Sequence, residues 1–341
     1  MGTLKSAALR ALCAVTALAG LVLSFDAHAL DKVKIGLLPV PSSGPIYVAV
    51  EKGYFAAEGI EPQLVFFQGG PPVPTGVVSG DLDFGAAALI GAFYNLAGQG
   101  ALRIIAGLSR EAPTFEGQGY IVNAKLYASG FTSLKQFAGH SIAVTAMGGP
   151  AHYAVGLLAT KYGFDLASVR IVVVQSLSNA IAATETGQTD TTIISMTPAI
   201  PPLLQHGDVK LLGWVGDETP WQYGAVFTAS RTADARTEVV ERFLRAFGKG
   251  VRDYHDAFTG ADGKRKDGPT APAILAILAK YFGSVETAKF SITYVDRDAR
   301  LDVKDVLHQI DWYRARGLIK GEVDGAKIID KRFVRDLGGP A

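Results

Sequence analysis

Ser79-Gly80-Asp81-Leu82-Asp83-Phe84-Gly85 returns 107 residues later in the chain as Thr186-Gly187-Gln188-Thr189-Asp190. The same spacing relates the apolar run Lys34-Ile35-Gly36-Leu37-Leu38 to Ser141-Ile142-Ala143-Val144. A repeat this long indicates duplicated domains, because solenoid repeats are about 20 to 50 residues long. The sequence therefore predicts two similar lobes that face one another across a cleft, and clefts between domains are where small molecules bind.

Strand-like runs alternate with helical ones from Val33 to about Leu212. This alternation predicts α/β lobes with parallel sheets and helices on both faces of each sheet. The run from Ile171 to Val174 is apolar on both faces of a strand, which is typical of a sheet covered on both sides. We therefore expect it in the core.

Two further segments look like crossings between the lobes. Residues 119–123 lead from the first copy toward the second, and residues 224–228 lead out of the second copy. If both are extended and lie side by side, they form a two-stranded hinge, and domain closure usually turns on a few such connecting residues.

The N-terminus has the pattern of a signal peptide. Lys5 and Arg10 precede an apolar run from Ala11 to Phe25, which is followed by Ala27-His28-Ala29, a small-x-small cleavage site. A membrane anchor is the alternative, but the run is shorter than the about 20 apolar residues that span a bilayer. We expect residues 1–29 to be removed on export, with cleavage after about Ala29.

The composition excludes several classes of function. The only cysteine, Cys13, lies in the predicted leader, so the exported chain would have no disulfide, thiolate metal site or cysteine nucleophile. The whole chain has a formal net charge of +1, and removal of Lys5, Arg10 and Asp26 with the leader would leave none. Without a basic excess, nucleic acid is not an expected partner.

Catalytic motifs are also missing from the sequence. It contains no G-x-S-x-G, H-E-x-x-H, C-x-x-C or P-loop pattern, and the six histidines lie far apart. Gly117-Gln118-Gly119 lacks the third glycine and the helix start of a dinucleotide fingerprint. We expect no catalysis, no cofactor and no metal site.

The chain resembles the periplasmic solute-binding proteins of ABC importers, in the group that takes up sulfonates, taurine, nitrate and thiamine precursors. The resemblance extends over nearly the whole exported chain. It rests on the strand at Ile35-Gly36 and on four longer segments: YVAVEKGYFAAEGI at 47–60, VSGDLDFG at 78–85, LKQFAGHSIAV at 134–144 and IDWYRARGLI at 310–319.

This resemblance implies two doubly wound α/β lobes joined by a two-stranded hinge, of which the first is discontinuous. The implied domains are residues 30–121 together with 228–341 for the first lobe and residues 122–227 for the second. It also implies a periplasmic protein, which we expect to be a monomer, with an inner-membrane ABC permease as partner. The alternatives are a cytosolic biosynthetic enzyme of the same fold and a receptor that presents its closed form to a membrane sensor.

In open α/β sheets a ligand lies beyond the carboxyl ends of the strands. The loop at 39–47 and its counterpart at 145–153 place glycine, proline and small residues at predicted helix N-termini, which suit an anionic group. Thr197 stands where many relatives have an acidic residue before a proline, so a ligand amine is disfavoured. Arg110 follows an apolar strand run and would pair with a carboxylate or sulfonate, although an ion pair at the surface is an equal alternative.

The predicted ligand-binding residues are Pro41, Ser42, Ser43, Gly44, Gln68, Gly69, Ala87, Ala88, Arg110, Gly148, Gly149, Ala151, His152, Ser195, Thr197 and Trp214. Trp214 is included as an aromatic wall, with a core position as its alternative. The expected ligand is a small organic anion, a sulfonate or carboxylate with an aromatic or aliphatic body, while nitrate, a pyrimidine and a neutral solute stay open. Contacts made by both lobes would favour the closed form of the cleft.

Overall fold

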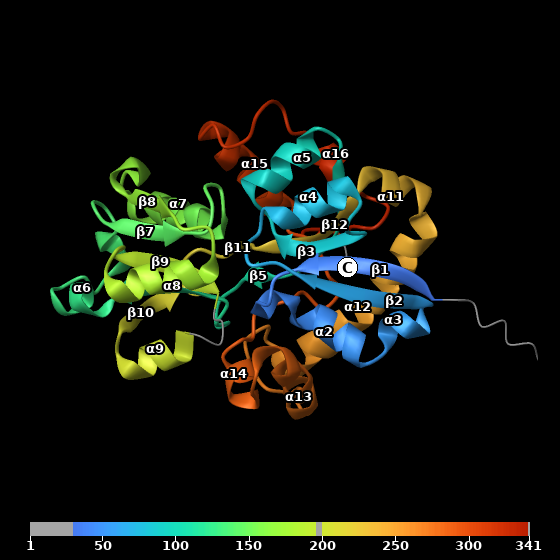
Figure 1. Cartoon of the computed structure of the whole chain (residues 1–341), viewed down its shortest axis with the longest axis horizontal. Coiled ribbons are helices and arrows are strands. Elements are labelled where there is room, and N and C mark those ends of the chain that lie inside the picture. The colour runs from blue at the N-terminus through green and yellow to red at the C-terminus, as the bar shows by residue number, and fades with distance from the viewer. Residues whose placement is uncertain (1–29, 196–199, 340–341) are drawn as a thin grey trace, which may run out of the picture. The chain divides into compact units, whose positions relative to one another are not determined.

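Two five-stranded sheets organise the chain in the computed structural model, which describes residues 30–195 and 200–339 (Figure 1). The predicted leader at 1–29 and the predicted contact Thr197 lie outside the described residues. The first sheet has the order β2-β1-β3-β12-β4 and the second has the order β10-β6-β9-β7-β8. Their strands are β1 (Asp31–Leu37), β2 (Ile60–Phe66), β3 (Phe84–Ala88), β4 (Leu102–Gly107), β6 (Gln118–Asn123), β7 (Ser141–Val144), β8 (Arg170–Val173), β9 (Thr191–Ser195), β10 (Val209–Trp214) and β12 (Gly224–Ala229).

Helices follow most strands and cover the sheets. They are η1 (Pro41–Ser43), α2 (Gly44–Glu51), α3 (Tyr54–Ala57), α4 (Pro72–Ser79), α5 (Gly91–Gly98), α6 (Ala124–Ala128), η2 (Leu134–Gln136), α7 (Pro150–Tyr162), η3 (Leu166–Ser168), α8 (Leu177–Thr186), α9 (Ile200–His206), α10 (Val215–Glu218), α11 (Ser230–Ala235), α12 (Thr237–Phe258), α13 (Ala271–Phe282), α14 (Val285–Lys289), α15 (Val303–Ala315) and α16 (Gly325–Ile328). Within the described ranges, none of these helices has both the length and the apolar character needed to cross a membrane.

The sequence repeat is also a repeat of strand register. In the first sheet β1 is parallel to β2, with Lys34 opposite Gln63, and in the second sheet β7 is parallel to β8, with Ser141 opposite Arg170. Each partner in the second pair lies 107 residues after its counterpart in the first. The two copies therefore fold into sheets with equivalent pairing.

The repeated aspartates perform the same task in both copies. Asp83 Oδ2 accepts a hydrogen bond from the Lys34 N–H at 2.9 Å, and Asp190 Oδ2 accepts one from the Ser141 N–H at 2.7 Å. Each carboxylate thereby ties the turn before one strand to the backbone of its parallel neighbour. Hydrogen bonds to an ionised group are about twice as strong as neutral ones, which explains why the sequence has aspartate at both positions.

Both sheets contain the expected parallel pairs, but one strand in each sheet is antiparallel to its neighbours. β12 is antiparallel to β3 and β4, and β6 is antiparallel to β9 and β10. These two strands contain the predicted crossings 119–123 and 224–228, but they do not pair with each other. Each lies inside a five-stranded sheet and is buried along its whole length. The two predicted crossings therefore do not form a two-stranded sheet with each other.

The two-stranded sheet between the lobes consists of β5 (Arg110–Glu111) and β11 (Trp221–Gln222), which pair antiparallel and are labelled between the two sheets in Figure 1. It lies just before β6 and just before β12 in sequence. The predicted domain limits at 121/122 and 227/228 fall inside β6 and β12, and the assignment of domains stays a prediction.

The prediction that residues 171–174 belong to the core is also wrong. β8 is the last strand of the second sheet and pairs only with β7 among the described strands. Its side chains are intermediate or exposed, and Val173 is 45% exposed. A run that is apolar on both faces of a strand can thus form an edge strand as well as a central one.

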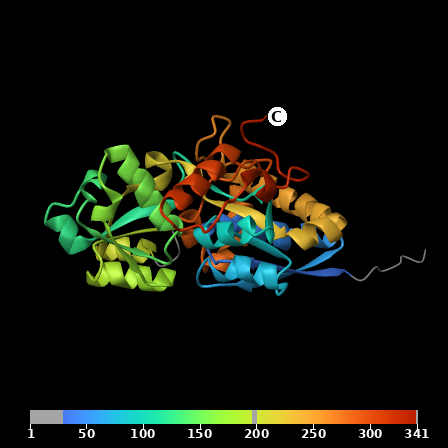
Figure 2. The ribbon, with the colours of Figure 1, turned by 90° about the horizontal axis from the view of Figure 1, so that it is seen from above.

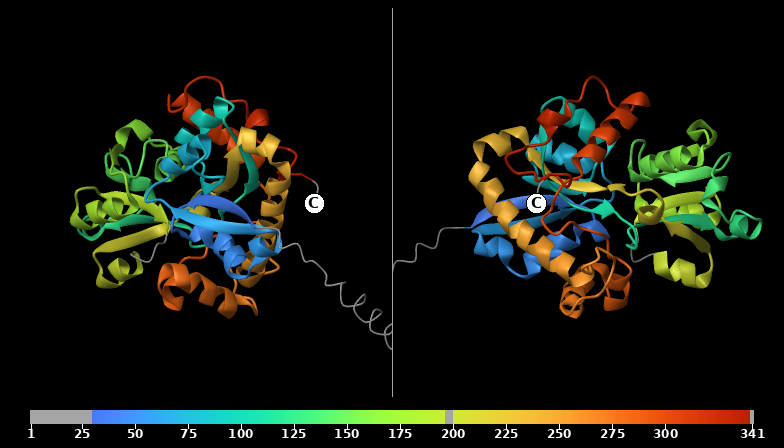
Figure 3. Two further views of the ribbon diagram at one scale, coloured as in Figure 1. Left: turned by 45° about the vertical axis from the view of Figure 1, so that its right-hand side comes forward. Right: turned by 180° about the vertical axis from the view of Figure 1, so that it is seen from behind.

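Two of the three hydrophobic clusters among the described residues show how the helices pack on the sheets. In one, the long helix α12 (gold in Figure 3) crosses the first sheet and packs against α2, where Gly250 allows close approach because a Cβ there would lie 2.5 Å from the Pro45 oxygen. The other cluster includes residues of both sheets and of helix α15, whose position can be followed in Figure 2. α15 therefore belongs to the packing of both repeats.

Candidate functional site

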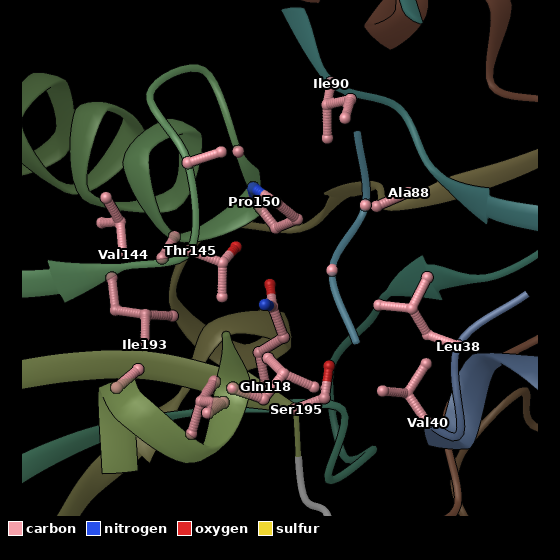
Figure 4. A pocket seen from close by; sticks show the side chains of 18 of the residues that line it. Leu38, Val40, Ala88, Ile90, Gln118, Val144, Thr145, Pro150, Ile193 and Ser195 are labelled. Carbon is pink, nitrogen blue, oxygen red and sulfur yellow. The ribbon is translucent and has the colours of Figure 1, made fainter. Parts of the chain in front are cut away.

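A pocket lies where the carboxyl ends of β1 and β3 face those of β7 and β9 (Figure 4). It contains about 750 Å³ of space that protein atoms do not fill, part of it open to solvent.

Equivalent positions of the two repeats line opposite sides of this pocket. Ser42, after β1, corresponds by the repeat to Gly149, after β7, and Ala88, at the end of β3, corresponds to Ser195, at the end of β9. The pocket therefore lies between equivalent positions of the two repeats, which carry different side chains on its two sides. Serine and alanine leave room for a ligand close to both backbones.

Uncharged side chains form the whole lining that the structure describes. Aliphatic residues such as Leu38, Val40 and Ile90 alternate with a few polar groups, and no Asp, Glu, Lys, Arg or His is among the described lining residues. The polar side chains are Ser42, Gln118, Thr145, Thr192, Ser195 and Tyr223. Such a lining offers hydrogen bonds and apolar contact without a formal charge.

Tyr223 and Ser195 form a polar pair in the lining. The Ser195 Oγ lies 3.4 Å from the Tyr223 hydroxyl oxygen. Burial raises the pKa of Tyr223 to about 12, so its phenol keeps its proton at neutral pH and can donate a hydrogen bond.

The N-terminus of α7 borders the pocket at Gly149 and Pro150. The Gly149 N–H is already used, since it donates to the Ala146 oxygen at 3.1 Å, and the Gly148 N–H donates to His152 Nδ1 at 3.1 Å. Burial, with a smaller effect from the charge of Arg316, lowers the pKa of His152 to about 4. His152 is therefore neutral at pH 7 and acts as an acceptor that shapes the loop.

The structure brings seven of the predicted ligand-binding residues into the lining. These are Ser42, Gly69, Ala87, Ala88, Gly149, Ala151 and Ser195. Eight others lie outside it, namely Pro41, Ser43, Gly44, Gln68, Arg110, Gly148, His152 and Trp214.

Local contacts explain several of the residues outside the lining. The Ser43 hydroxyl donates to the Leu38 oxygen at 2.8 Å, and a Cβ at Gly44 would lie 2.6 Å from Tyr254, so both face the core of the first sheet. Arg110 Nη2 binds Asp302 Oδ2 at 2.8 Å, which directs its guanidinium to the start of α15. The sequence left open an ion pair at the surface beside Glu111, and the pair that the structure shows is partly buried and joins Arg110 to Asp302 instead.

The predicted ligand-binding residues do not include Gln118 and Tyr223, and the strand directions explain why. Gln118 is the first residue of β6 and Tyr223 directly precedes β12, and both strands are antiparallel to their neighbours, so the rule that places ligands at the carboxyl ends of strands does not find these residues. Gln118 is opposite Ser195 in the register of β6 and β9, and Gly224, next to Tyr223, is opposite Ala88. Recognition of β6 and β12 as antiparallel would have placed both side chains at the pocket.

Comparison with known proteins identifies the family. The family model described as NMT1/THI5 like matches residues 40–257. The chain belongs to the NMT1/THI5-like family. No curated protein matches it in sequence.

Solved structures show that this NMT1/THI5-like protein has the predicted binding-protein fold. It is similar to the alkanesulfonate-binding protein SsuA from Xanthomonas axonopodis pv. citri bound to MOPS, with 19% identity over 89% of this chain and 99% of that chain and a TM-score of 0.69. It is also similar to the nitrate-binding protein NrtA from Synechocystis PCC 6803, with 14% identity over 89% and 87% of the two chains and a TM-score of 0.71. The periplasmic aliphatic sulphonate binding protein SsuA from Escherichia coli has 17% identity over 91% and 95% and a TM-score of 0.67.

In this NMT1/THI5-like protein the two repeats touch directly beside the pocket. The N–H of Gly91, the first residue of α5, donates to the Gly148 oxygen at 3.0 Å. Elsewhere, a Cβ at Gly69 would lie 3.2 Å from the Gln175 oxygen. Both contacts join a segment of the first repeat to a loop of the second.

The helix α15 braces the same region from outside the pocket. Tyr153 of α7 packs against Trp312 of α15, with ring centroids 5.2 Å apart, and its hydroxyl lies 2.8 Å from His308 Nδ1. Gly156 allows this packing, because a Cβ there would lie 2.3 Å from the Trp312 ring. Helix α15 thus fixes α7, whose N-terminus borders the pocket.

Glu111 is a buried carboxyl in the two-stranded sheet. It is 2% exposed, and its Oε2 accepts a hydrogen bond from the Gln118 N–H at 3.1 Å. Burial raises the pKa of Glu111 to about 7, although this hydrogen bond opposes the rise. Within the described ranges no group of three or more His, Cys, Asp or Glu residues is arranged to hold a metal ion.

Proposed function

We propose that this protein is the periplasmic solute-binding component of an ABC importer, which captures a small organic anion in the pocket and delivers it to an inner-membrane permease. The observation that carries the proposal is the pocket itself, which is built from equivalent loops of two repeats at the carboxyl ends of their strands. A ligand there contacts both repeats at once. Periplasmic location rests on the predicted leader, and we expect a monomer.

The chemistry of the lining supports an anion over a cation. No carboxylate is present among the described lining residues, so a ligand ammonium would have no charged partner. Pro150 and Leu177, the first residues of α7 and α8, both line the pocket, and helix N-termini favour negative charge. The similar structures that carry sulfonate-binding and nitrate-binding names support the same direction.

The apolar part of the lining supports an organic ligand. Leu38, Val40 and Ile90 on the first side and Val144 and Leu177 on the second give an aliphatic surface. Burial of apolar ligand area there contributes about 25 cal/mol per Å². We therefore propose a sulfonate or carboxylate with an aromatic or aliphatic body, in preference to nitrate.

Closure of the two repeats on the ligand is the proposed mechanism. Only contacts that differ between open and closed forms can shift their balance. The Gly91 to Gly148 hydrogen bond joins the repeats beside the pocket, and the described lining groups neither take nor give a proton at neutral pH. We propose that the protein binds its ligand unchanged and does not act as an enzyme.

A thermal-shift screen of residues 30–341 tests this function. The probes are alkyl and aryl sulfonates, the matching carboxylates, nitrate, pyrimidines, and the uncharged sulfonamides and carboxamides of the same bodies. A ligand at about 100 times its Kd adds about 2.7 kcal/mol, which shifts Tm by several degrees. Shifts confined to organic anions are expected, whereas shifts confined to uncharged probes, or none at all, would overturn the proposal.

A variant that fills the pocket is the control for location. Ala88→Leu adds three carbons to the lining and should abolish the shift, while Ala128→Leu makes the same change at an exposed position of α6 and should not. Equal shifts in both variants would place the ligand elsewhere.

A further inference from the structure

Gln118 is a buried polar residue at the pocket whose side chain is not used by the fold. It is 3% exposed, and its Oε1 has no hydrogen-bond partner within residues 30–195 and 200–339. Its backbone N–H holds the residue in place by donating to Glu111 Oε2. The side chain is thus free to serve something that the folded chain does not contain.

The amide of Gln118 is aimed into the pocket. Figure 4 shows its end pointing toward the middle of the space, with Ser195 beside it and Pro150, the first residue of α7, opposite. The side chain stands next to Ser195 because β6 and β9 pair at this point, yet the Ser195 hydroxyl is directed to Tyr223 at 3.4 Å. The nearest hydroxyl in the register is therefore engaged elsewhere.

A buried amide oxygen without a partner is costly. Leaving such a group unsatisfied costs about 1–3 kcal/mol, and more than nine-tenths of buried polar groups avoid it. Leucine would fill similar space without this cost. The glutamine is explained if a bound molecule supplies the missing donor.

We propose that the ligand carries an N–H or O–H group that donates to Gln118 Oε1, in addition to its anionic group. The ligand is then a hydroxy-substituted or amide-substituted organic acid instead of an unsubstituted one. This inference rests on the proposed function and specifies the ligand class of the same pocket. The anionic group lies toward the N-terminus of α7, and the donor lies at the opposite side, against Gln118.

Specificity follows from the same contact. A site built to hydrogen-bond a ligand group rejects the analogue that lacks it, because the protein group is then left unpaired in the complex. An unsubstituted acid would displace solvent from the pocket and still leave Gln118 Oε1 without a donor. We expect such analogues to bind about 10- to 100-fold more weakly.

Calorimetric titration with matched probes tests the inference on residues 30–341. The aryl series is benzoate, 4-hydroxybenzoate and 4-methoxybenzoate, and the alkyl series is propanesulfonate, 3-hydroxypropanesulfonate and 3-methoxypropanesulfonate. Within each series the charge is constant, while the substituent is absent, able to donate, or able only to accept. The hydroxy member should bind about 10- to 100-fold more tightly than the other two in at least one series.

Gln118→Leu identifies the residue responsible. It should remove the advantage of the hydroxy probe and leave the affinity of the unsubstituted probe within about threefold. Gln205→Leu, the same change at an exposed position of α9, should keep the advantage. Thermal unfolding of each variant checks folding, and the wild-type comparison stands alone if Gln118→Leu does not fold.

The outcomes separate this inference from the proposed function. If the methoxy or unsubstituted probe binds as tightly as the hydroxy probe, or the advantage survives Gln118→Leu, the donor inference is overturned while anion capture stands. If no member of either series binds, both are overturned.

Discussion

Glu111→Gln should make the protein more stable at alkaline pH but not at acidic pH. The folded-state pKa of Glu111 is raised from 4.5 to about 7 by burial. Between these two values the folded protein holds a proton that the unfolded chain has released. Stability of the wild type is therefore greatest, with respect to this group, below about pH 4.5 and falls as the pH rises to about 7.

The magnitude follows from the pKa difference. One unit corresponds to about 1.4 kcal/mol, so Glu111 should cost the wild type about 3 kcal/mol above pH 7. Glutamine keeps a carbonyl oxygen that can accept the Gln118 N–H, and it carries no charge to desolvate. The free energy of unfolding of Glu111→Gln minus that of the wild type should therefore rise by about 3 kcal/mol between pH 4.5 and pH 8.

Urea unfolding at half-unit steps of pH measures this difference, since all other titrating groups are shared and cancel. Glu61→Gln on β2, an exposed position, controls for the loss of one negative charge. A difference between Glu111→Gln and the wild type that is constant with pH would refute the assignment of a buried, protonated carboxyl in the two-stranded sheet.

Three further predictions concern the packing around the pocket. Gly156→Ala puts a Cβ 2.3 Å from the Trp312 ring and should cost about 1–3 kcal/mol, seen in calorimetry as a lower Tm; an unchanged Tm would contradict the packing of α7 on α15. Gly91→Pro places proline at the first position of α5, where it is tolerated, but removes the N–H that donates to the Gly148 oxygen. A pocket ligand should then bind about fivefold more weakly. Equal affinity of the variant and the wild type in titration would show that this contact does not favour closure. His152 should titrate in NMR with a pKa near 4 because it is buried beside Arg316, and a value near 6.5 would mean that its ring is solvated.

The repeat is the part of the fold that the sequence predicts best. Its 107-residue spacing depends on residues whose role is local, such as Asp83 and Asp190, which bind the backbone of a neighbouring strand. Because each repeat makes these bonds within itself, the pattern persists in the sequence and reveals both sheets. Strands β6 and β12 have no such signal, because their direction depends on how the chain passes between the sheets.

Lining residues that directly follow a parallel strand could be predicted from the sequence. Lining residues that reach the pocket only through the pairing of their strand with a neighbour could not. Ser42 and Gly149 were found because they follow β1 and β7. Gln118 was not, since its place beside Ser195 comes from antiparallel pairing. Arg110 looked equally suitable in sequence, but its partner Asp302 lies far along the chain and decides where the guanidinium points.

The position of β12 also sets an order of assembly. β4 joins the first sheet only through β12, which is made more than a hundred residues later, whereas all strands of the second sheet come from residues 118–214. Contacts between residues so distant in sequence form late, because a long loop must close first. Because the chain is made from its N-terminus onward, the second repeat can complete its sheet while the edge of β3 that pairs with β12 is still unpaired. β12 therefore completes the first sheet only after the second repeat has been made.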